Sequence, residues 1–216
     1  MSVTAIPAAV AAHDPRDAWP SVTRILKAAG LSPWQDVTLE QLRRGVQHGL
    51  DERKLRYILQ GVDPAVLDAK AELGKMAHLA VEDIERGMTE AWWADSEIAP
   101  YAAAYLKFKS EMDYRAAAVE LRVYNDAYHY QGTLDSWGQM GEAEVVVDIK
   151  TTVAMPADLP YQLAGYDLCL AANPKRSRWG VQLKPDGTYR LNEYAGRNDA
   201  KIFLAAVAIA HTKGIL

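Results

Sequence analysis

The stretch VELRVYNDAYHYQGTLDSWGQMGEAEVVVDIK, residues 119–150, contains three segments in which apolar and polar side chains alternate. Alternation is typical of β-strands, because neighbouring side chains of a strand point to opposite faces of a sheet. We therefore expect strands at residues 119–124, 128–137 and 144–149. The connections between them are short, so the three strands form an antiparallel meander.

The third strand of this meander ends in an acid and an amine. Asp148 and Lys150 are two residues apart, so they lie on one face of the strand, opposite Val147 and Ile149. An isolated pair of this kind is most often an exposed ion pair at the end of a strand. The pair alone therefore indicates no chemistry.

The register of the meander brings further acids to the same place. A loop centred on residues 141–142 pairs Asp135 with Asp148, and a turn over residues 125–128 pairs Glu120 with Asp135. Opposed carboxylates destabilise a sheet and raise one another's pKa, unless a cation lies among them. Carboxylate oxygens are the ligands that Mg²⁺ and Mn²⁺ prefer, so the row predicts a site for one of these ions.

Helices are expected where apolar residues recur at helical spacing after a capping residue, and two more alternating segments indicate further strands. This places helices at residues 21–29, from Thr38, around Leu55, and at residues 64–86, 97–116, 160–172 and 198–211, with strands at residues 179–183 and 189–194. The order of these elements predicts a mixed α/β (α+β) fold, a central mixed sheet flanked by helices after a helical N-terminal region.

The sequence divides the chain into a short N-terminal arm and one large domain. Residues 1–19 have no periodicity and contain two prolines, so we expect a loose N-terminal arm. Residues 20–216 are expected to form one domain, in which residues 20–116 are the helical part and residues 117–216 the core sheet with its helices.

Composition excludes several classes of protein. The 216 residues carry a formal net charge of −4 at pH 7, so the molecule as a whole does not attract polyanions. The single cysteine, Cys169, can form neither an internal disulfide nor a thiolate metal cluster, which favours a reducing compartment. The longest apolar run, residues 202–210, is far shorter than the roughly 20 residues of a membrane-spanning helix. We expect a cytoplasmic protein with no membrane partner.

Three motifs in this order resemble those of a known superfamily. They are GTLD at residues 132–135, DIKTT at residues 148–152 and QLAGY at residues 162–166, preceded by GKMAH at residues 74–78. The set is similar to the PD-(D/E)XK nucleases, specifically their RecB-like exonuclease branch, which uses G-x-x-x-H, G-x-x-D, D-x-K-T and Q-x-x-x-Y. The resemblance covers residues 74–166 and implies a restriction-endonuclease-like core. The four cysteines of the iron–sulfur members are missing, so the chain resembles the cluster-free, phage-type members.

The resemblance also implies a role for each motif residue. The metal ligands would be the side chains of His78, Asp135 and Asp148 and the backbone carbonyl of Ile149, and Lys150 would be the catalytic lysine. Glu120 matches an acid of the first core strand that varies within the family, so it stays open whether Glu120 is functional.

Gln162 and Tyr166 lie one helical turn apart. The resemblance implies that they support the site and contact the nucleic acid. Packing at the edge of the sheet is the alternative role for this pair.

The function implied is that of a metal-dependent deoxyribonuclease, in the first place an exonuclease, that hydrolyses phosphodiester bonds of single- or double-stranded DNA with Mg²⁺ or Mn²⁺. A non-catalytic nucleic-acid-binding or adaptor protein on a nuclease fold is the alternative, and a hydrolase of small phosphate esters is a third. A homo-oligomer or a partner recombination protein stays open.

Two further sets of residues have an open role. Three tyrosines could stack on bases or pack in the core, and three basic residues could contact phosphates or form a solvated turn. The tyrosines are Tyr124, Tyr128 and Tyr130, and the basic residues are Lys175, Arg176 and Arg178.

Overall fold

The computed structural model describes residues 14–31, 64–88, 92–94 and 96–214. Its centre is a five-stranded mixed sheet in which the strands lie in chain order, and only β3 and β4 run parallel. The strands are β1 (Tyr114–Asn125), β2 (Tyr130–Met140), β3 (Ala143–Lys150), β4 (Ser177–Leu183) and β5 (Tyr189–Glu193). The predicted antiparallel meander and the later hairpin are both present.

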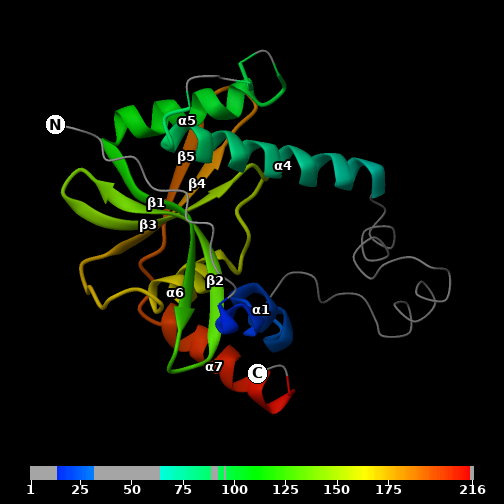
Figure 1. Cartoon of the computed structure of the whole chain (residues 1–216), viewed down its shortest axis with the longest axis vertical. Coiled ribbons are helices and arrows are strands. Elements are labelled where there is room, and N and C mark those ends of the chain that lie inside the picture. The colour runs from blue at the N-terminus through cyan, green and yellow to red at the C-terminus, as the bar shows by residue number, and fades with distance from the viewer. Residues whose placement is uncertain (1–13, 32–63, 89–91, 95, 215–216) are drawn as a thin grey trace.

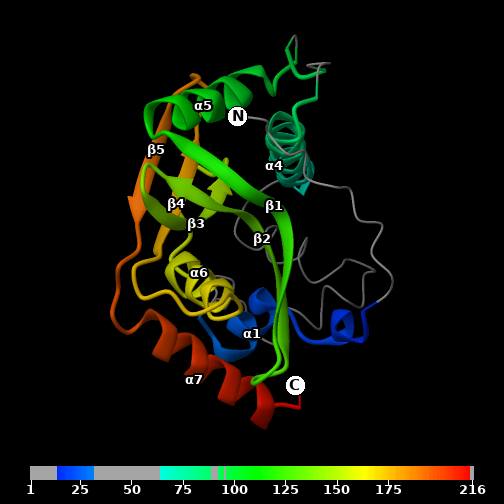
Figure 2. The same ribbon diagram turned by 60° about the vertical axis from the view of Figure 1, so that its left-hand side comes forward.

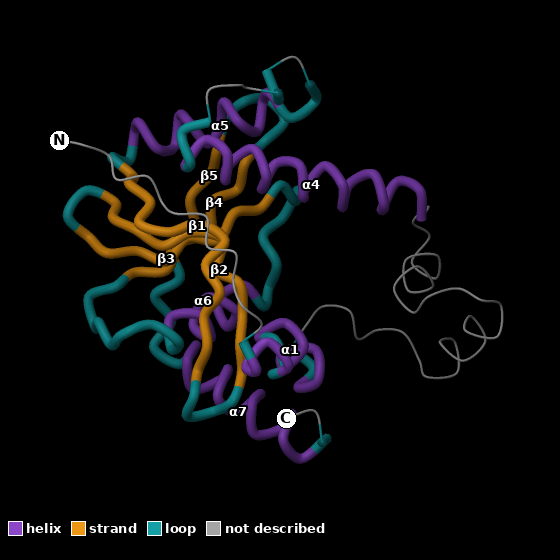
Figure 3. The backbone as a smooth tube through the Cα atoms, viewed as in Figure 1, coloured by secondary structure: helices purple, strands orange, loops and turns teal. Residues whose placement is uncertain are grey.

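Helices cover both faces of the sheet (Figures 1 and 3). In chain order they are the 3-10 helix η1 (Pro15–Ala18) and the α-helices α1 (Val22–Ala29), α4 (Pro64–Glu85), α5 (Ala99–Glu111), α6 (Leu159–Asp167) and α7 (Asp199–Thr212). The helices expected from Thr38 and around Leu55 lie outside the described residues, as do residues 1–13 of the expected arm. The mixed α/β class predicted from the sequence is confirmed.

Two apolar cores hold these layers together. On one face, Val145, Val147 and Ile149 of β3 pack with buried residues of α4 and α5. On the other face, Val146 of β3 packs with residues of α1, α6 and α7. The alternation along β3 therefore buries both faces of this central strand, as its apolar sequence predicts.

Two helix ends differ from the expectation. The helix expected at residues 97–116 ends at Glu111, because Asp113 has a positive φ of 46° and turns the chain into β1. The following alanines favour helix by intrinsic propensity, but pairing with β2 overrides it. The helix expected to continue to residue 172 ends at Asp167.

The predicted register is confirmed on both sides of the acids. Leu121 pairs with Leu134 and Val119 with Ser136, so Glu120 and Asp135 occupy the intervening positions of β1 and β2. Pairing of β2 with β3 runs as far as Ser136 and Val147, one position before Asp135 and Asp148.

The β1–β2 hairpin is long and curved. Figure 2 shows it reaching from the α4 and α5 side of the sheet to α1 and α7. Glu120 has a positive φ of 47° in the middle of β1, a conformation that non-glycine residues rarely adopt. Residues 121 and 123 beyond it pack near or in the core of α1, α6 and α7. We infer that the hairpin bends at Glu120, which is also where the acids lie.

The N-terminal segment is attached to this hairpin where it is described. Asp17 of η1 accepts hydrogen bonds from the Tyr124 hydroxyl, at 2.6 Å, and from Arg122, at 2.9 Å. Residues 14–19 of the expected loose arm are thus held against β1. Among the described helices, none combines the length and the apolar character that crossing a membrane requires.

Candidate metal site

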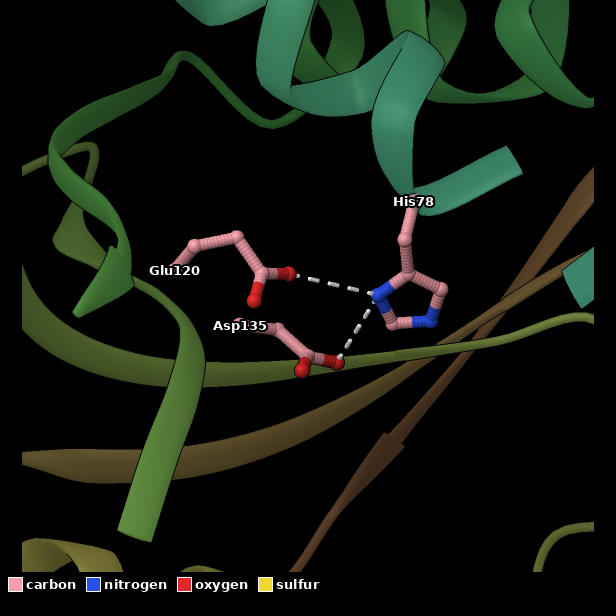
Figure 4. Close-up of side chains that lie close together, drawn as sticks. All are labelled: His78, Glu120 and Asp135. Carbon is pink, nitrogen blue, oxygen red and sulfur yellow. Dashed lines mark ion pairs between the residues drawn. The ribbon is translucent and has the colours of Figure 1, made fainter. Parts of the chain in front are cut away.

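Three side chains from three elements converge beside the sheet (Figure 4). His78 of α4 points its Nδ1 atom at Glu120 Oε1 of β1 and at Asp135 Oδ2 of β2, and both distances are 3.7 Å. One ligand atom of each residue lies within 4.8 Å of the others. Ligands bonded at about 2.0–2.2 Å to one ion lie roughly 3–4 Å apart, so this group has the size of a cation site.

Gly74 of α4 faces the segment that follows β3. A Cβ atom there would lie 3.4 Å from Thr151 Oγ1, an ordinary van der Waals contact, so this approach of α4 does not by itself require glycine. His78 is one turn further along α4. The spacing of GKMAH therefore places its glycine at the contact and its histidine over the acids.

The Asp135 carboxylate is fixed by the neighbouring strand. Its Oδ2 accepts a hydrogen bond from the backbone amide of Ile149 at 2.7 Å. This bond lies just beyond Ser136 and Val147, the last paired residues of β2 and β3. The Asp135 carboxylate there accepts the hydrogen bond that a backbone carbonyl of β2 would accept if the strands continued to pair. The Asp135 carboxylate is therefore held in one orientation by β3.

The two carboxylates favour a positive charge between them. Burial by itself would lower the pKa of His78, but the charge of Asp135 and the contact with Glu120 raise it to about 9. At neutral pH without metal, a protonated imidazole thus balances the carboxylates. A divalent ion would replace that proton, because only the neutral imidazole has a lone pair to donate.

Asp148 and Lys150 form an ion pair next to this group that is less exposed to solvent. Asp148 is fully buried, and its Oδ2 lies 2.5 Å from Lys150 Nζ. Burial raises the pKa of Asp148 to about 6. The charge of Lys150 lowers this pKa, and the charge of Asp135 raises it. Burial would lower the pKa of Lys150, but Asp148 and Asp135 raise it above its ordinary value. Lys150 is therefore a cation at neutral pH.

Gln162 and Tyr166 of α6 support Asp148 from behind. Gln162 Nε2 donates to Asp148 Oδ1 at 3.2 Å and to the Tyr166 hydroxyl at 3.0 Å. Tyr166 is only 5% exposed, and its ring fills the space that a Cβ on Gly132 would need. This pair therefore joins the Asp148 carboxylate to α6 and packs against β2 at Gly132.

An open pocket of about 660 Å³ lies over the three converging residues. Its described lining consists of Gly74, Lys75, His78, Leu79, Glu82, Glu120 and Asp135. Lys75, Leu79 and Glu82 are not among the site residues predicted from the sequence. Lys75 and Glu82 lie three and four residues from His78, and Leu79 lies four residues from Lys75, so helical spacing was the signal that could have found them.

One buried amide was also missed. Gln182 of β4 pairs in register with Lys150 and donates to the carbonyl oxygens of Thr152 and Val153, at 2.6 and 2.8 Å. It therefore holds the chain where it turns away after Lys150. The signal was a single polar residue in the otherwise apolar end of a strand.

The structure brings the sequence-predicted residues together in two groups. His78, Glu120 and Asp135 share one spot, whereas the Asp148 carboxylate is turned to Lys150 and Gln162. Glu120, whose role the sequence left open, is part of the first group. The Ile149 amide donates to Asp135, so Ile149 touches the first group through its backbone N–H.

The other open residues are mostly structural. Tyr130 is fully buried and donates to the Gly165 carbonyl, and Arg16 lies over the Tyr124 ring at 4.2 Å. Arg176 is bonded to Glu144 at 2.7 Å and to Asp167 at 2.6 Å. Arg178 pairs with Asp199 at 3.1 Å. Of the three tyrosines, Tyr128 keeps a ring that is 41% exposed.

Comparison with known proteins gives no family for this chain. No family model matches it, and no curated protein matches it significantly.

Proposed function

We propose that the chain is a Mg²⁺- or Mn²⁺-dependent deoxyribonuclease, built on a restriction-endonuclease-like core. The observation that carries this proposal is the convergence of His78, Glu120 and Asp135 from α4, β1 and β2. Beside them, Asp148 and Lys150 supply a buried acid and a charged amine. Hard oxygen ligands, one imidazole and a fixed ammonium suit hydrolysis of a phosphate ester.

The donor set fits a divalent ion. His78, Glu120 and Asp135 would hold it, and Asp148 with the Ile149 carbonyl lies on the next strand as a further source of oxygen ligands. When bound, the ion would activate water and neutralise charge on the phosphate. The strain of the positive φ at Glu120 is of the kind that gathers at functional sites.

The residues of β3 and α6 would orient the reactants. Lys150 has donors and no acceptor, so it would hold a phosphate oxygen or the attacking water in place. Asp148 keeps the Lys150 ammonium charged and fixed, and Gln162 fixes Asp148 in turn. The Glu120 and Asp135 carboxylates would otherwise repel a phosphate, and a bound cation would offset that repulsion.

Labelled single- and double-stranded DNA, incubated with Mg²⁺, Mn²⁺ or EDTA, tests the proposal. We expect cleavage with the metals, none with EDTA, and a loss of roughly 10³-fold or more in Lys150→Ala and Asp148→Ala. Lys107→Ala, on the far end of α5, is the matched control and should cleave normally. Binding of DNA without cleavage by the unmodified protein would instead indicate a nucleic-acid-binding protein, and hydrolysis of small phosphate esters alone would indicate the third class.

A further inference from the structure

One stripe of α4 lines the pocket. His78 and Leu79 each lie three or four residues from Lys75 and from Glu82, so the four residues lie along the same face of the helix. Among the described residues that line the pocket, Lys75 alone carries a permanent positive charge. The stripe therefore carries a positive charge at Lys75, on the N-terminal side of His78, and a negative charge at Glu82, on its C-terminal side.

The two charged ends of the stripe differ in how firmly they are paired. Glu82 is mostly buried and is bonded to Arg86 at 2.5 Å. Lys75 is 74% exposed, and its one ion pair with the residues that the structure describes is with Glu72, which is 62% exposed, at 3.2 Å. Exposed pairs of this kind contribute about 0–1 kcal/mol, so an anion could take over Lys75 at little cost.

The distance along α4 fits neighbouring phosphates. Lys75 precedes His78 by three residues, which is about 4.5 Å along a helix axis. Successive nucleotides of one strand rise about 3.4 Å along a duplex axis, and their phosphates lie further apart than this because the strand winds around the axis, a span that the long lysine side chain can cover. A strand cut at His78, Glu120 and Asp135 would thus present its next phosphate to Lys75.

The C-terminal half of α4 is a poor path for an anion. Arg86, which follows it, is held by Glu82 at 2.5 Å. The nearby Lys109 is held by the buried Glu85 at 2.7 Å. The N-terminal half extends beyond the sheet in Figure 1. An anionic strand at the pocket therefore finds its more available cation at Lys75, toward the N-terminal half of the helix.

We propose that Lys75 binds the phosphate next to the one that is cut, so that the DNA strand leaves the acids along the N-terminal half of α4. The proposal rests on the proposed function and adds the position and direction of the substrate. Lys75 acts in binding and takes no part in the bond-breaking step.

Steady-state cleavage of a short oligonucleotide at several NaCl concentrations tests it. Lys75→Gln should raise KM about five-fold and leave kcat within about two-fold, because a binding contact is lost. The slope of log kcat/KM against log salt should become shallower by about 0.7–0.9, the loss of one phosphate contact. Lys75→Arg should restore both quantities.

Lys107→Gln is the matched control, since Lys107 is an exposed lysine of α5 in a helical pair with Glu111 and does not line the pocket. It should keep the KM and the salt slope of the unmodified protein. Unchanged values in Lys75→Gln, or equal changes in both variants, would overturn this proposal alone. Failure of the unmodified protein to bind or cut DNA would overturn the proposed function, and this inference with it.

Discussion

Lys150 and Asp148 form a salt bridge of 2.5 Å in which the acid has no contact with solvent. Burial raises the pKa of Asp148 to about 6 even with this partner beside it. The folded chain therefore prefers the protonated acid more than the unfolded chain does. By linkage, the contribution of Asp148 to the free energy of unfolding is full below about pH 4 and is lost as pH rises through about 6.

Replacing Lys150 should make this loss larger. Lys150→Ala removes the ammonium that lowers the pKa of Asp148, so the pKa of Asp148 should rise further. The free energy of unfolding should then continue to fall up to a higher pH. We expect the variant to be less stable than the unmodified protein by about 3–5 kcal/mol at pH 8, and by clearly less at pH 4. Urea unfolding in EDTA at pH 4, 6 and 8 measures the difference.

The double variant Lys150→Ala/Asp148→Asn is the control for this prediction. It leaves no buried charge at the pair, so its stability relative to the unmodified protein should lose most of the dependence on pH that Lys150→Ala shows. A deficit in Lys150→Ala that stays the same from pH 4 to pH 8 would show that lost packing, not the unpaired acid, is the cause.

Metal titrations can separate the two groups of acids. His78→Ala, Glu120→Gln and Asp135→Asn should each weaken Mn²⁺ binding at least ten-fold in calorimetry, because these three residues share one spot. Asp148→Asn should weaken it less, since its carboxylate is already engaged by Lys150 and Gln162. Unchanged affinity in His78→Ala would return the histidine to a structural role. A larger loss in Asp148→Asn than in Glu120→Gln would favour the ligand set that the resemblance implies.

The register of the acids was predictable because it depends on the number of residues in the loops between the strands. Two short loops fix which residues face each other, and a strand buried on both faces resists slipping by one residue. The pairs around Glu120 and Asp135 accordingly agree with the expected register. The same counting could not show that Glu120 has a positive φ, because such strain depends on the surrounding packing.

Orientation of the side chains was the harder part. Asp135 and Asp148 were expected to act together, yet one faces His78 and the other faces Lys150. Register places two residues opposite each other but does not choose their rotamers. That choice depends on partners such as Gln162 and the Ile149 amide, which come from distant positions in the sequence.

Gly132 is required by a contact that the sequence did not reveal. A Cβ there would lie 2.4 Å from Tyr166 Cε1, so Gly132→Ala must displace the Tyr166 ring. We expect a loss of about 1–3 kcal/mol in the free energy of unfolding, and lower cleavage because Gln162 loses its partner. Adding Tyr166→Ala should cost less in this background than in the unmodified protein, and full additivity of the two changes in urea unfolding would contradict the contact.

Arg176 tests whether the basic turn is structural. Its side chain is 3% exposed and joins Glu144 to Asp167, so Arg176→Ala leaves two carboxylates without their partner. Since both acids are partly exposed and Glu144 keeps its hydrogen bonds from Trp137 and Asn173, we expect a moderate loss of about 2–3 kcal/mol in urea unfolding, with no change in KM for DNA under the proposed function. Lys175→Ala, which removes the exposed neighbouring charge, should change stability by less than about 0.5 kcal/mol. A raised KM with unchanged stability in Arg176→Ala would make Arg176 a substrate contact, which its present bonds to both acids argue against.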